Sequence, residues 1–208
     1  TMAGLRGGRS AGDGLVQQVL AGLAAARAAG FDPAAGDLKL NAVIQRGVND
    51  DQLIPLAELA RSQRMELRLI EYMDVGNRNG WRMDQVLPAE VMVQRIAEHW
   101  PLRSLGRNPG GTARRWRYHD EVSDVGVVAS ISEPFCGDCN RLRITADGQA
   151  FTCLFAAQGT DLTPAMGSDQ ELEHAICSLW QRRSDRYSEE RHCTADSLPR
   201  AEMAYLGG

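Results

Sequence analysis

Three cysteines and two arginines lie within the segment FCGDCNRLRITADGQAFTC, at positions 135–153. Cys136 and Cys139 have the Cys-x2-Cys spacing that can place two thiolates on one metal centre, and Cys153 follows further along. Asp147-Gly148, between them, is typical of a hairpin turn, which would return Cys153 to the first pair. In a reducing compartment such grouping indicates metal binding more than disulfides.

Three kinds of site are compatible with these thiols. A structural zinc site needs a fourth ligand, which would have to be Cys177, Cys193 or a histidine such as His119. A disulfide would leave one of the three cysteines over. A 4Fe–4S cluster held by three cysteines keeps one iron without a protein ligand, and that iron can bind a small molecule. The spacing predicts a metal but does not choose between iron–sulfur and zinc.

Basic side chains near the cysteines suggest an anionic ligand. Arg141 and Arg143 alternate along the strand expected after Cys139, so they point the same way and could receive an anion beside the open iron. Lys39 is the one lysine among 23 basic residues, which suggests a position where a planar guanidinium would not serve.

The composition is that of an ordinary globular protein of 208 residues, with a net charge of −4. The sequence shows neither an apolar run near the ~20 residues of a membrane span nor a signal-peptide pattern, so a cytoplasmic location without a membrane partner is expected. The arginine-rich stretch 101–118 contains aromatic residues that could stack on bases. The negative net charge nevertheless argues against a nucleic-acid partner.

The pattern of elements predicts an α/β fold with a parallel sheet. Asp13 is expected to cap a first helix that Gly30 closes, and residues 101–117 are expected to form an arginine-rich loop. Lys39 and Asn41 share one face of the first strand, which would be either a wet edge or the rim of an active site. Glu71 could line the cavity or could satisfy nearby backbone groups. The expected helices are 15–29, 53–65, 88–99 and 170–183, and the expected strands are 38–44, 66–73, 114–118 and 125–131.

Residues 135–155 closely resemble the C-terminal signature of the MoaA family, the radical S-adenosylmethionine GTP 3′,8-cyclases of molybdenum-cofactor biosynthesis. LKLNAVIQRGVNDDQL and LRLIEYMDVGNRNGW resemble later strands of that family's barrel. RSDRYSEER and the terminal Gly207-Gly208 resemble its tail. The resemblance covers nearly the whole chain.

The resemblance implies a role for each matched position. It implies that a second, substrate-binding 4Fe–4S cluster is held by three cysteines and binds the guanine of GTP at its open iron. It further implies contacts to GTP from a lysine and from an Arg-Leu-Arg stretch, a methionine lining the S-adenosylmethionine site, and a glycine tail reaching the active site. The matched cluster ligands are Cys136, Cys139 and Cys153. The matched contacts to GTP are Lys39 and the stretch Arg141, Leu142 and Arg143. The matched methionine is Met73, and the matched tail is Gly207 and Gly208.

The fold implied is the C-terminal remnant of an incomplete (β/α) TIM-type barrel over 1–80, followed by an α+β region over 81–208 that carries the iron–sulfur site. The family's Cys-x3-Cys-x2-Cys motif, which holds the cluster that cleaves S-adenosylmethionine, is absent, because the first cysteine is Cys136. The chain is therefore expected to be a C-terminal portion that cannot alone convert GTP to 3′,8-cyclo-7,8-dihydro-GTP.

The partners implied are GTP, a second copy in a homodimer and a separately encoded N-terminal half. Cyclic pyranopterin monophosphate synthase would act downstream in the pathway. The alternative function is a non-catalytic binding module stabilised by zinc or by a cluster. Binding of GTP separates the two, since a binding module of that kind does not need it.

Overall fold

The computed structural model describes residues 12–191 and 200–206, which form two compact units. The first unit contains the described residues up to Tyr72 together with 84–108 and 113–132. The second contains 73–83, 109–112 and the described residues from Glu133 onward. Among the described residues, no helix is long and apolar enough to cross a membrane.

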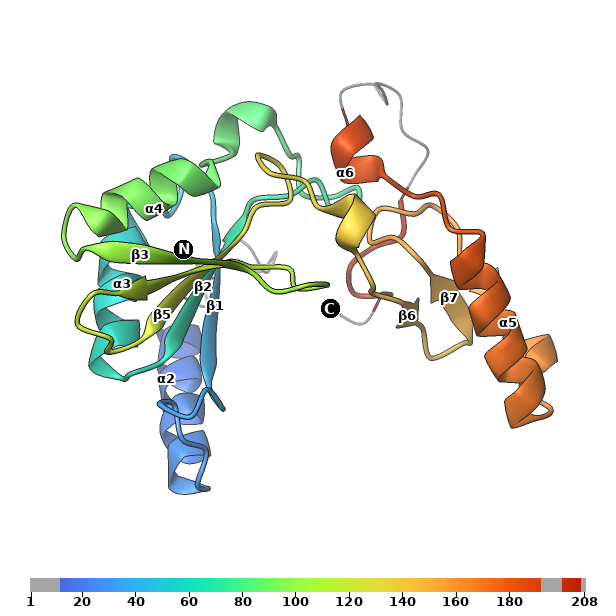
Figure 1. Ribbon diagram of the computed structural model, residues 1–208, viewed down its shortest axis with the longest axis horizontal. Helices are drawn as coiled ribbons and strands as arrows, with labels where there is room; N and C mark the ends of the chain where they lie inside the picture. The colour runs from blue at the N-terminus through green and yellow to red at the C-terminus, as the bar shows by residue number, and fades with distance from the viewer. Residues whose placement is uncertain (1–11, 192–199, 207–208) are drawn as a thin grey trace. The chain divides into compact units, whose positions relative to one another are not determined.

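The first unit is built on a five-stranded mixed sheet with the order β1-β2-β5-β4-β3 (Figure 1). Its three parallel strands confirm the predicted α/β class with a parallel sheet. Two antiparallel strands extend the sheet past residue 80, and the predicted domain boundary there stays a prediction. The parallel strands are β1 (Lys39–Ile44), β2 (Glu66–Glu71) and β5 (Asp124–Val128); the antiparallel ones are β4 (Arg114–Tyr118) and β3 (Leu102–Arg107).

Helices cover this sheet and complete its apolar core. The helices are α2 (Gly12–Ala28), α3 (Leu53–Ser62) and α4 (Ala89–Ala97), with short 3-10 turns η1 (Asp50–Gln52) and η2 (Met83–Gln85). The helix α3 joins β1 to β2 and contacts both β2 and α4, while α4 contacts β5. Alternate residues of β2 are buried, as the two-residue period of a strand requires, and Leu67 and Leu69 belong to the apolar core.

The second unit contains a small antiparallel sheet and two helices. The strands are β6 (Arg143–Ile144), β7 (Gln149–Phe151) and β8 (Thr160–Asp161), and the helices are α5 (Asp169–Gln181) and α6 (Tyr187–Glu190). Two 3-10 turns, η3 (Cys136–Asp138) and η4 (Thr163–Ala165), complete it. The predicted hairpin turn at Asp147-Gly148 is confirmed, because β6 pairs with β7 and Gly148 has a φ of +83°.

Two local predictions are wrong. Asp13 lies inside α2 and not before it, since that helix begins at Gly12, whereas Gly30 closes it as expected with a φ of +98°. The predicted arginine loop contains β3. Arginines can face each other across β3 and β4 because acidic residues neutralise them: Glu121 accepts from Arg103 at 2.8 Å, and Asp124 accepts from both Arg115 and Arg117.

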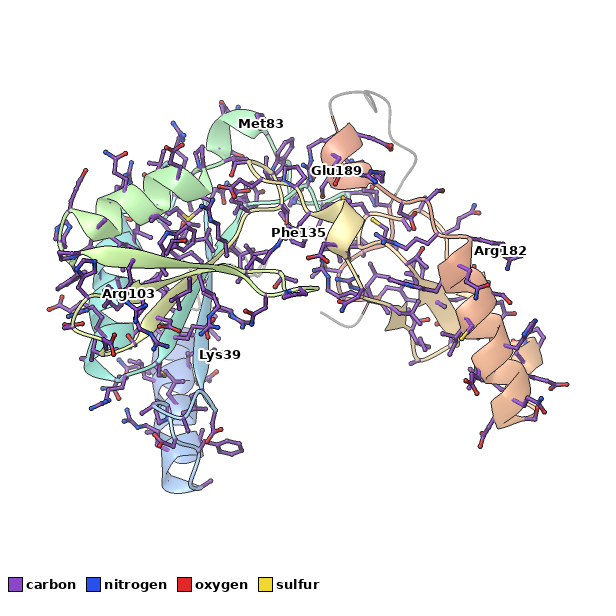
Figure 2. All side chains as sticks on the ribbon, in the orientation of Figure 1. Lys39, Met83, Arg103, Phe135, Arg182 and Glu189 are labelled. Atoms are coloured by element: carbon purple, nitrogen blue, oxygen red, sulfur yellow. The ribbon has the colours of Figure 1, made fainter. Side chains whose placement is uncertain are left out.

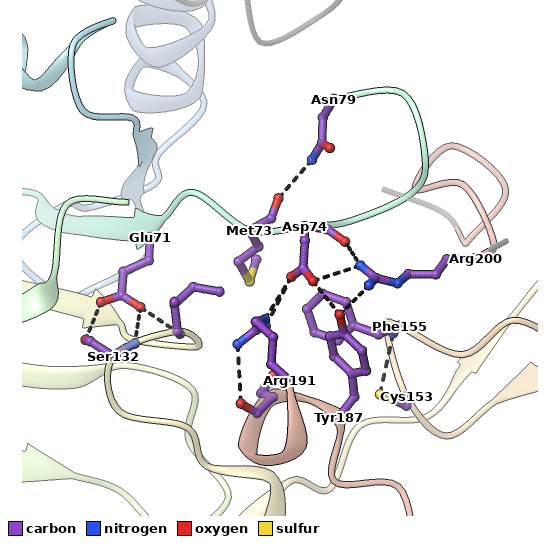
Figure 3. A network of polar contacts seen from close by, with 12 residues as sticks. Glu71, Met73, Asp74, Asn79, Ser132, Cys153, Phe155, Tyr187, Arg191 and Arg200 are labelled. Carbon is purple, nitrogen blue, oxygen red and sulfur yellow. Dashed lines mark hydrogen bonds and ion pairs between the residues drawn. The ribbon is translucent and has the colours of Figure 1, made fainter. Parts of the chain in front are cut away.

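Glu71 resolves in favour of a structural role. Its side chain is fully buried at the end of β2, and it accepts backbone N–H groups of Ala89 at 2.9 Å, Ile131 at 2.7 Å and Ser132 at 2.9 Å (Figure 3). The Ser132 hydroxyl also donates to it. Ala89 is the first residue of α4, and Pro88 before it supplies no side-chain cap. Glu71 therefore caps α4 and satisfies the backbone that follows β5.

We predict that Glu71→Ala lowers the free energy of unfolding by about 3 kcal/mol or more. The substitution leaves the N–H groups of Ile131 and Ser132 without an acceptor, each at a cost of about 1–3 kcal/mol when buried, and leaves Ala89 only a long bond of 3.4 Å to the Ser132 hydroxyl. Urea denaturation of the chain measures the effect, with Glu90→Ala as the matched control because Glu90 is exposed on the first turn of the same helix. Equal stability of the two variants would contradict the structural role.

Candidate metal and anion site

The three grouped cysteines lie in the second unit, on the two arms of the β6–β7 hairpin. Cys136 begins η3, and Cys139 ends it with its N–H donating to the Cys136 carbonyl at 3.3 Å. Arg143 pairs with Phe151 across the hairpin, so Cys153 follows closely after the last paired residue. The three thiols are unbonded and partly buried.

The arrangement of the thiols bears on the kind of metal centre that they could hold. Among the described residues, no group of three or more Cys, His, Asp or Glu is close enough to hold one metal ion. Cys136 nevertheless acts electrostatically on Cys153, and Arg143 experiences the charges of both Cys139 and Cys153. The described residues therefore show no closed zinc site of four ligands around one ion.

Of the other ligands considered for zinc, one lies on α5, one in the first unit and one outside the described residues. Cys177 is exposed on α5. His119 belongs to the first unit. Cys193 lies outside the described residues.

Cys139 is held as a hydrogen-bond acceptor by Arg141. The Nε and Nη2 atoms of Arg141 lie 3.3 Å and 3.2 Å from the Cys139 Sγ, and its guanidinium lies 5.3 Å from the centre of the Phe135 ring. Burial raises the pKa of the Cys139 thiol, but hydrogen bonds and charge from Arg141, with the charge of Arg183, outweigh it and leave the pKa below its ordinary value. The site therefore favours the thiolate at this position.

Cys153 is in the opposite state. Burial, with smaller contributions from the charges of Asp185 and Cys136, raises the pKa of its thiol. The Phe155 N–H at 3.5 Å and the charge of Arg183 oppose this shift without reversing it. Because metal ligation requires the thiolate, binding of a metal here would release a proton.

Arg143 is a partly buried cation near the thiols of Cys139 and Cys153. Burial lowers the pKa of its guanidinium, and repulsion by Arg141 adds to this, while Cys139 and Cys153 oppose it. Within the described part of the chain, no carboxylate pairs with Arg143. A partly buried guanidinium without an ion pair is costly unless an anion completes it. Arg141 and Arg143 together can therefore bind an anion beside the thiols.

Neighbouring segments fix the cysteine turn from outside. The Gly137 N–H donates to the side chain of Glu189 at 3.4 Å. Figure 2 labels Glu189 on α6. Gly110 of the NPGG loop donates to Asp138 at 3.1 Å, and a Cβ on Gly110 would lie 2.5 Å from the amide nitrogen of Asn140. Its φ of +67° also requires glycine. The NPGG loop thus packs on the cysteine turn.

The remaining predicted site residues lie in both units. Lys39 is in the first unit, on β1, with its side chain 39% exposed and its Nζ 3.9 Å from Glu66. Leu142 is partly buried between the two arginines of the second unit. Met73 follows β2, and its carbonyl accepts from the Asn79 side chain at 2.9 Å. Gly207 and Gly208 lie outside the described residues. The roles predicted for these residues stay predictions.

The sequence reasoning missed a cluster around Asp74 in the second unit (Figure 3). The Tyr187 hydroxyl donates to Asp74 at 2.5 Å, and the guanidinium groups of Arg191 and Arg200 lie 3.1 Å and 2.9 Å from its carboxylate. Phe155 stacks on Tyr187 with ring centres 4.6 Å apart, and both arginines lie over these rings. The cluster ties the segment after Cys153 to residues 187–191 and 200.

The relatives of this chain show its family. Its structure is mixed α/β, and two of the three grouped thiols, Cys139 and Cys153, lie near arginine side chains. The sequence profile described as Molybdenum Cofactor Synthesis C matches residues 65–189, and the chain belongs to this family.

Several curated relatives are named GTP 3′,8-cyclase. One from Synechococcus sp. (strain CC9605) is 70% identical over 207 residues, covering 100% of this chain and 60% of the relative. One from Acidothermus cellulolyticus is 50% identical over 93% of this chain and 60% of the relative. One from Xanthomonas campestris pv. campestris (strain B100) is 47% identical over 96% of this chain and 58% of the relative. The chain thus spans about 60% of the length of the relatives it matches.

We predict that Asp74→Asn destabilises the second unit by about 3 kcal/mol at pH 7, because it leaves two buried guanidinium groups without their carboxylate. Burial raises the pKa of Asp74, but Tyr187 and the two arginines outweigh it, so the folded pKa lies below the unfolded one. The stabilisation is therefore complete above the unfolded pKa of about 3.9 and is lost as the pH falls through the folded pKa.

Urea denaturation between pH 3 and pH 7, read by amide exchange in second-unit peptides, checks this dependence. The difference between the wild type and Asp74→Asn should shrink below about pH 4. Glu173→Gln, on the exposed face of α5, is the control. A difference that stays constant over this range would contradict the assigned pKa direction.

Proposed function

We propose that this chain supplies the substrate-binding portion of a radical S-adenosylmethionine GTP 3′,8-cyclase in molybdenum-cofactor biosynthesis. The relatives named for that activity support it, and one structural observation carries it. Of the three partly buried thiols, Cys139 and Cys153 lie near Arg141 and Arg143, and Arg143 has no carboxylate partner among the described residues. A cluster with an open iron and a nucleotide would complete both halves of this arrangement.

In this proposal Cys136, Cys139 and Cys153 hold a 4Fe–4S cluster, which supplies an open iron for the guanine base. The residues of the chain bind and orient the nucleotide. Arg141 donates to the Cys139 sulfur and so stabilises the thiolate that the cluster needs. Arg143 attracts the negatively charged substrate into a partly desolvated site, where the interaction is stronger than in water. A reducing compartment would keep all three thiols available.

The other assignments rest on the family resemblance. Lys39 and Leu142 would add contacts to GTP, Met73 would line the S-adenosylmethionine site, and Gly207-Gly208 would reach the active site. The parallel β1-α3-β2 unit is proposed to be part of an incomplete TIM-type barrel. The 208 residues contain no Cys-x3-Cys-x2-Cys motif, so the radical-forming step is assigned to a segment that they do not include. The chain alone should bind GTP without turning it over.

We predict that anaerobic reconstitution with iron and sulfide gives about four irons and four sulfides per chain. Cys136→Ser, Cys139→Ser and Cys153→Ser should each lose most of this content, because each removes one of the three ligands. Cys177→Ser is the matched control, since Cys177 is exposed on α5 and should leave the content unchanged. Retention of a single zinc ion, without sulfide, would contradict the proposal and favour a zinc-stabilised module.

We predict that Arg141→Ala and Arg143→Ala each weaken GTP binding to the cluster-loaded chain by about tenfold to a hundredfold. Each removes a charge-assisted hydrogen bond worth about 1.5–3 kcal/mol. Isothermal calorimetry with GTP measures the change. Arg182→Ala is the control, because Arg182 is exposed and bonds the Ser178 carbonyl of its own helix. Equal affinity of all three variants would remove the two arginines from the GTP site.

A further inference from the structure

Arg183 connects the two cysteine-bearing segments of the second unit. It follows α5, and its side chain is 13% exposed. Its Nη1 donates to the Cys139 carbonyl at 3.0 Å, and its Nε donates to the Thr152 carbonyl at 3.2 Å. Its Nη2 donates to the Asp185 carbonyl at 3.3 Å. All three nitrogens of this guanidinium thus donate to backbone carbonyls.

The two segments have few other ties close to the thiols. Residues 143–144 pair with 150–151 in the β6–β7 ladder, but the cysteines lie beyond its end on both arms. Arg183 binds two backbone carbonyls near the cysteines. One belongs to Cys139 itself, and the other belongs to Thr152, the residue immediately before Cys153. One guanidinium therefore spans the gap between two proposed ligands. A planar fork with fixed donor directions can bridge two acceptors in this way, whereas a single ammonium cannot reproduce its geometry.

Arg183 is itself held in place. The Asp185 carboxylate lies 3.7 Å from its Nε and accepts the Thr152 hydroxyl at 2.6 Å, so Thr152 is bound through both its carbonyl and its side chain. The guanidinium also lies 5.1 Å from the centre of the Trp180 ring. By contrast, the adjacent Arg182 is exposed and contacts its own helix.

We propose that Arg183 is a positioning residue that sets the separation of Cys139 and Cys153 in the metal-free chain and so preorganises the site for its cluster. The inference rests on the proposed function, since it presumes that a cluster binds there. Residues that orient metal ligands from outside typically change metal affinity by about 10–100-fold when they are replaced. Arg183 binds the backbone of one ligand and of the residue beside another, which makes it such an orienting group.

The test compares the wild type with Arg183→Ala, Arg183→Lys and the control Arg182→Ala. After anaerobic reconstitution, cluster loss to an iron chelator is followed by absorbance, and the reduced cluster by electron paramagnetic resonance. Arg183→Ala should lose its cluster at least tenfold faster than the wild type. Arg183→Lys, which keeps the charge but not the fork, should be intermediate, and Arg182→Ala should match the wild type.

A second readout uses the metal-free chain. Amide exchange should increase in Arg183→Ala at 139–142 and 152–155, while the paired residues of β7 keep their protection. Thr152→Val, which removes the bond to Asp185, should show a smaller increase in the same peptides and decides the question if Arg183→Ala does not fold. Wild-type rates of exchange and cluster loss in Arg183→Ala, or in Thr152→Val where that variant decides, would overturn the inference. Failure of the wild type to take up a cluster would instead overturn the proposed function.

Discussion

Arginine side chains bound to backbone carbonyls, carboxylates and aromatic rings hold the second unit together. Its apolar core is small, because the main cluster of buried hydrophobic residues lies wholly in the first unit. Arg183 joins the two cysteine arms, while Arg191 and Arg200 converge on Asp74 and stack on Phe155 and Tyr187. A unit with little apolar surface to bury depends on such charge-assisted contacts for its order. The shape of the cysteine site therefore depends on where these guanidinium groups are anchored.

The same arginines set the electrostatics of the site. Arg141 and Arg183 both favour the thiolate of Cys139, whereas burial keeps Cys153 protonated in the metal-free chain. Positive charge that stabilises a thiolate also attracts an anionic ligand, so one set of residues serves both the metal and the nucleotide in the proposed function. The carboxylate of Asp185 accepts the Thr152 hydroxyl and lies 3.7 Å from Arg183, so it partly offsets the positive charge of that arginine.

Local sequence patterns predicted many of the helices, strands and turns, but they did not predict contacts between residues far apart in the chain. Asp147-Gly148 predicts a hairpin because a turn with positive φ favours glycine. The alternation of Leu67 and Leu69 predicts a strand with one buried face. Arg183 escaped prediction because its partners are backbone carbonyls, which any residue carries. The Asp74 cluster escaped because it joins residues more than a hundred positions apart. The strand β3 was missed because the acids that neutralise its arginines follow later in the chain.

Two partly or fully buried ionisable groups show how structure separates a folding role from a binding role. Glu71 is fully buried, yet the backbone around it satisfies it, so folding alone explains its place in β2. Arg143 has no such compensation among the described residues: a second guanidinium lies nearby, and the groups that oppose that repulsion are thiols. A partly buried guanidinium without a carboxylate partner lowers the stability of the folded chain. Under the proposed function, a nucleotide would supply Arg143 with the negative charge that no described carboxylate supplies.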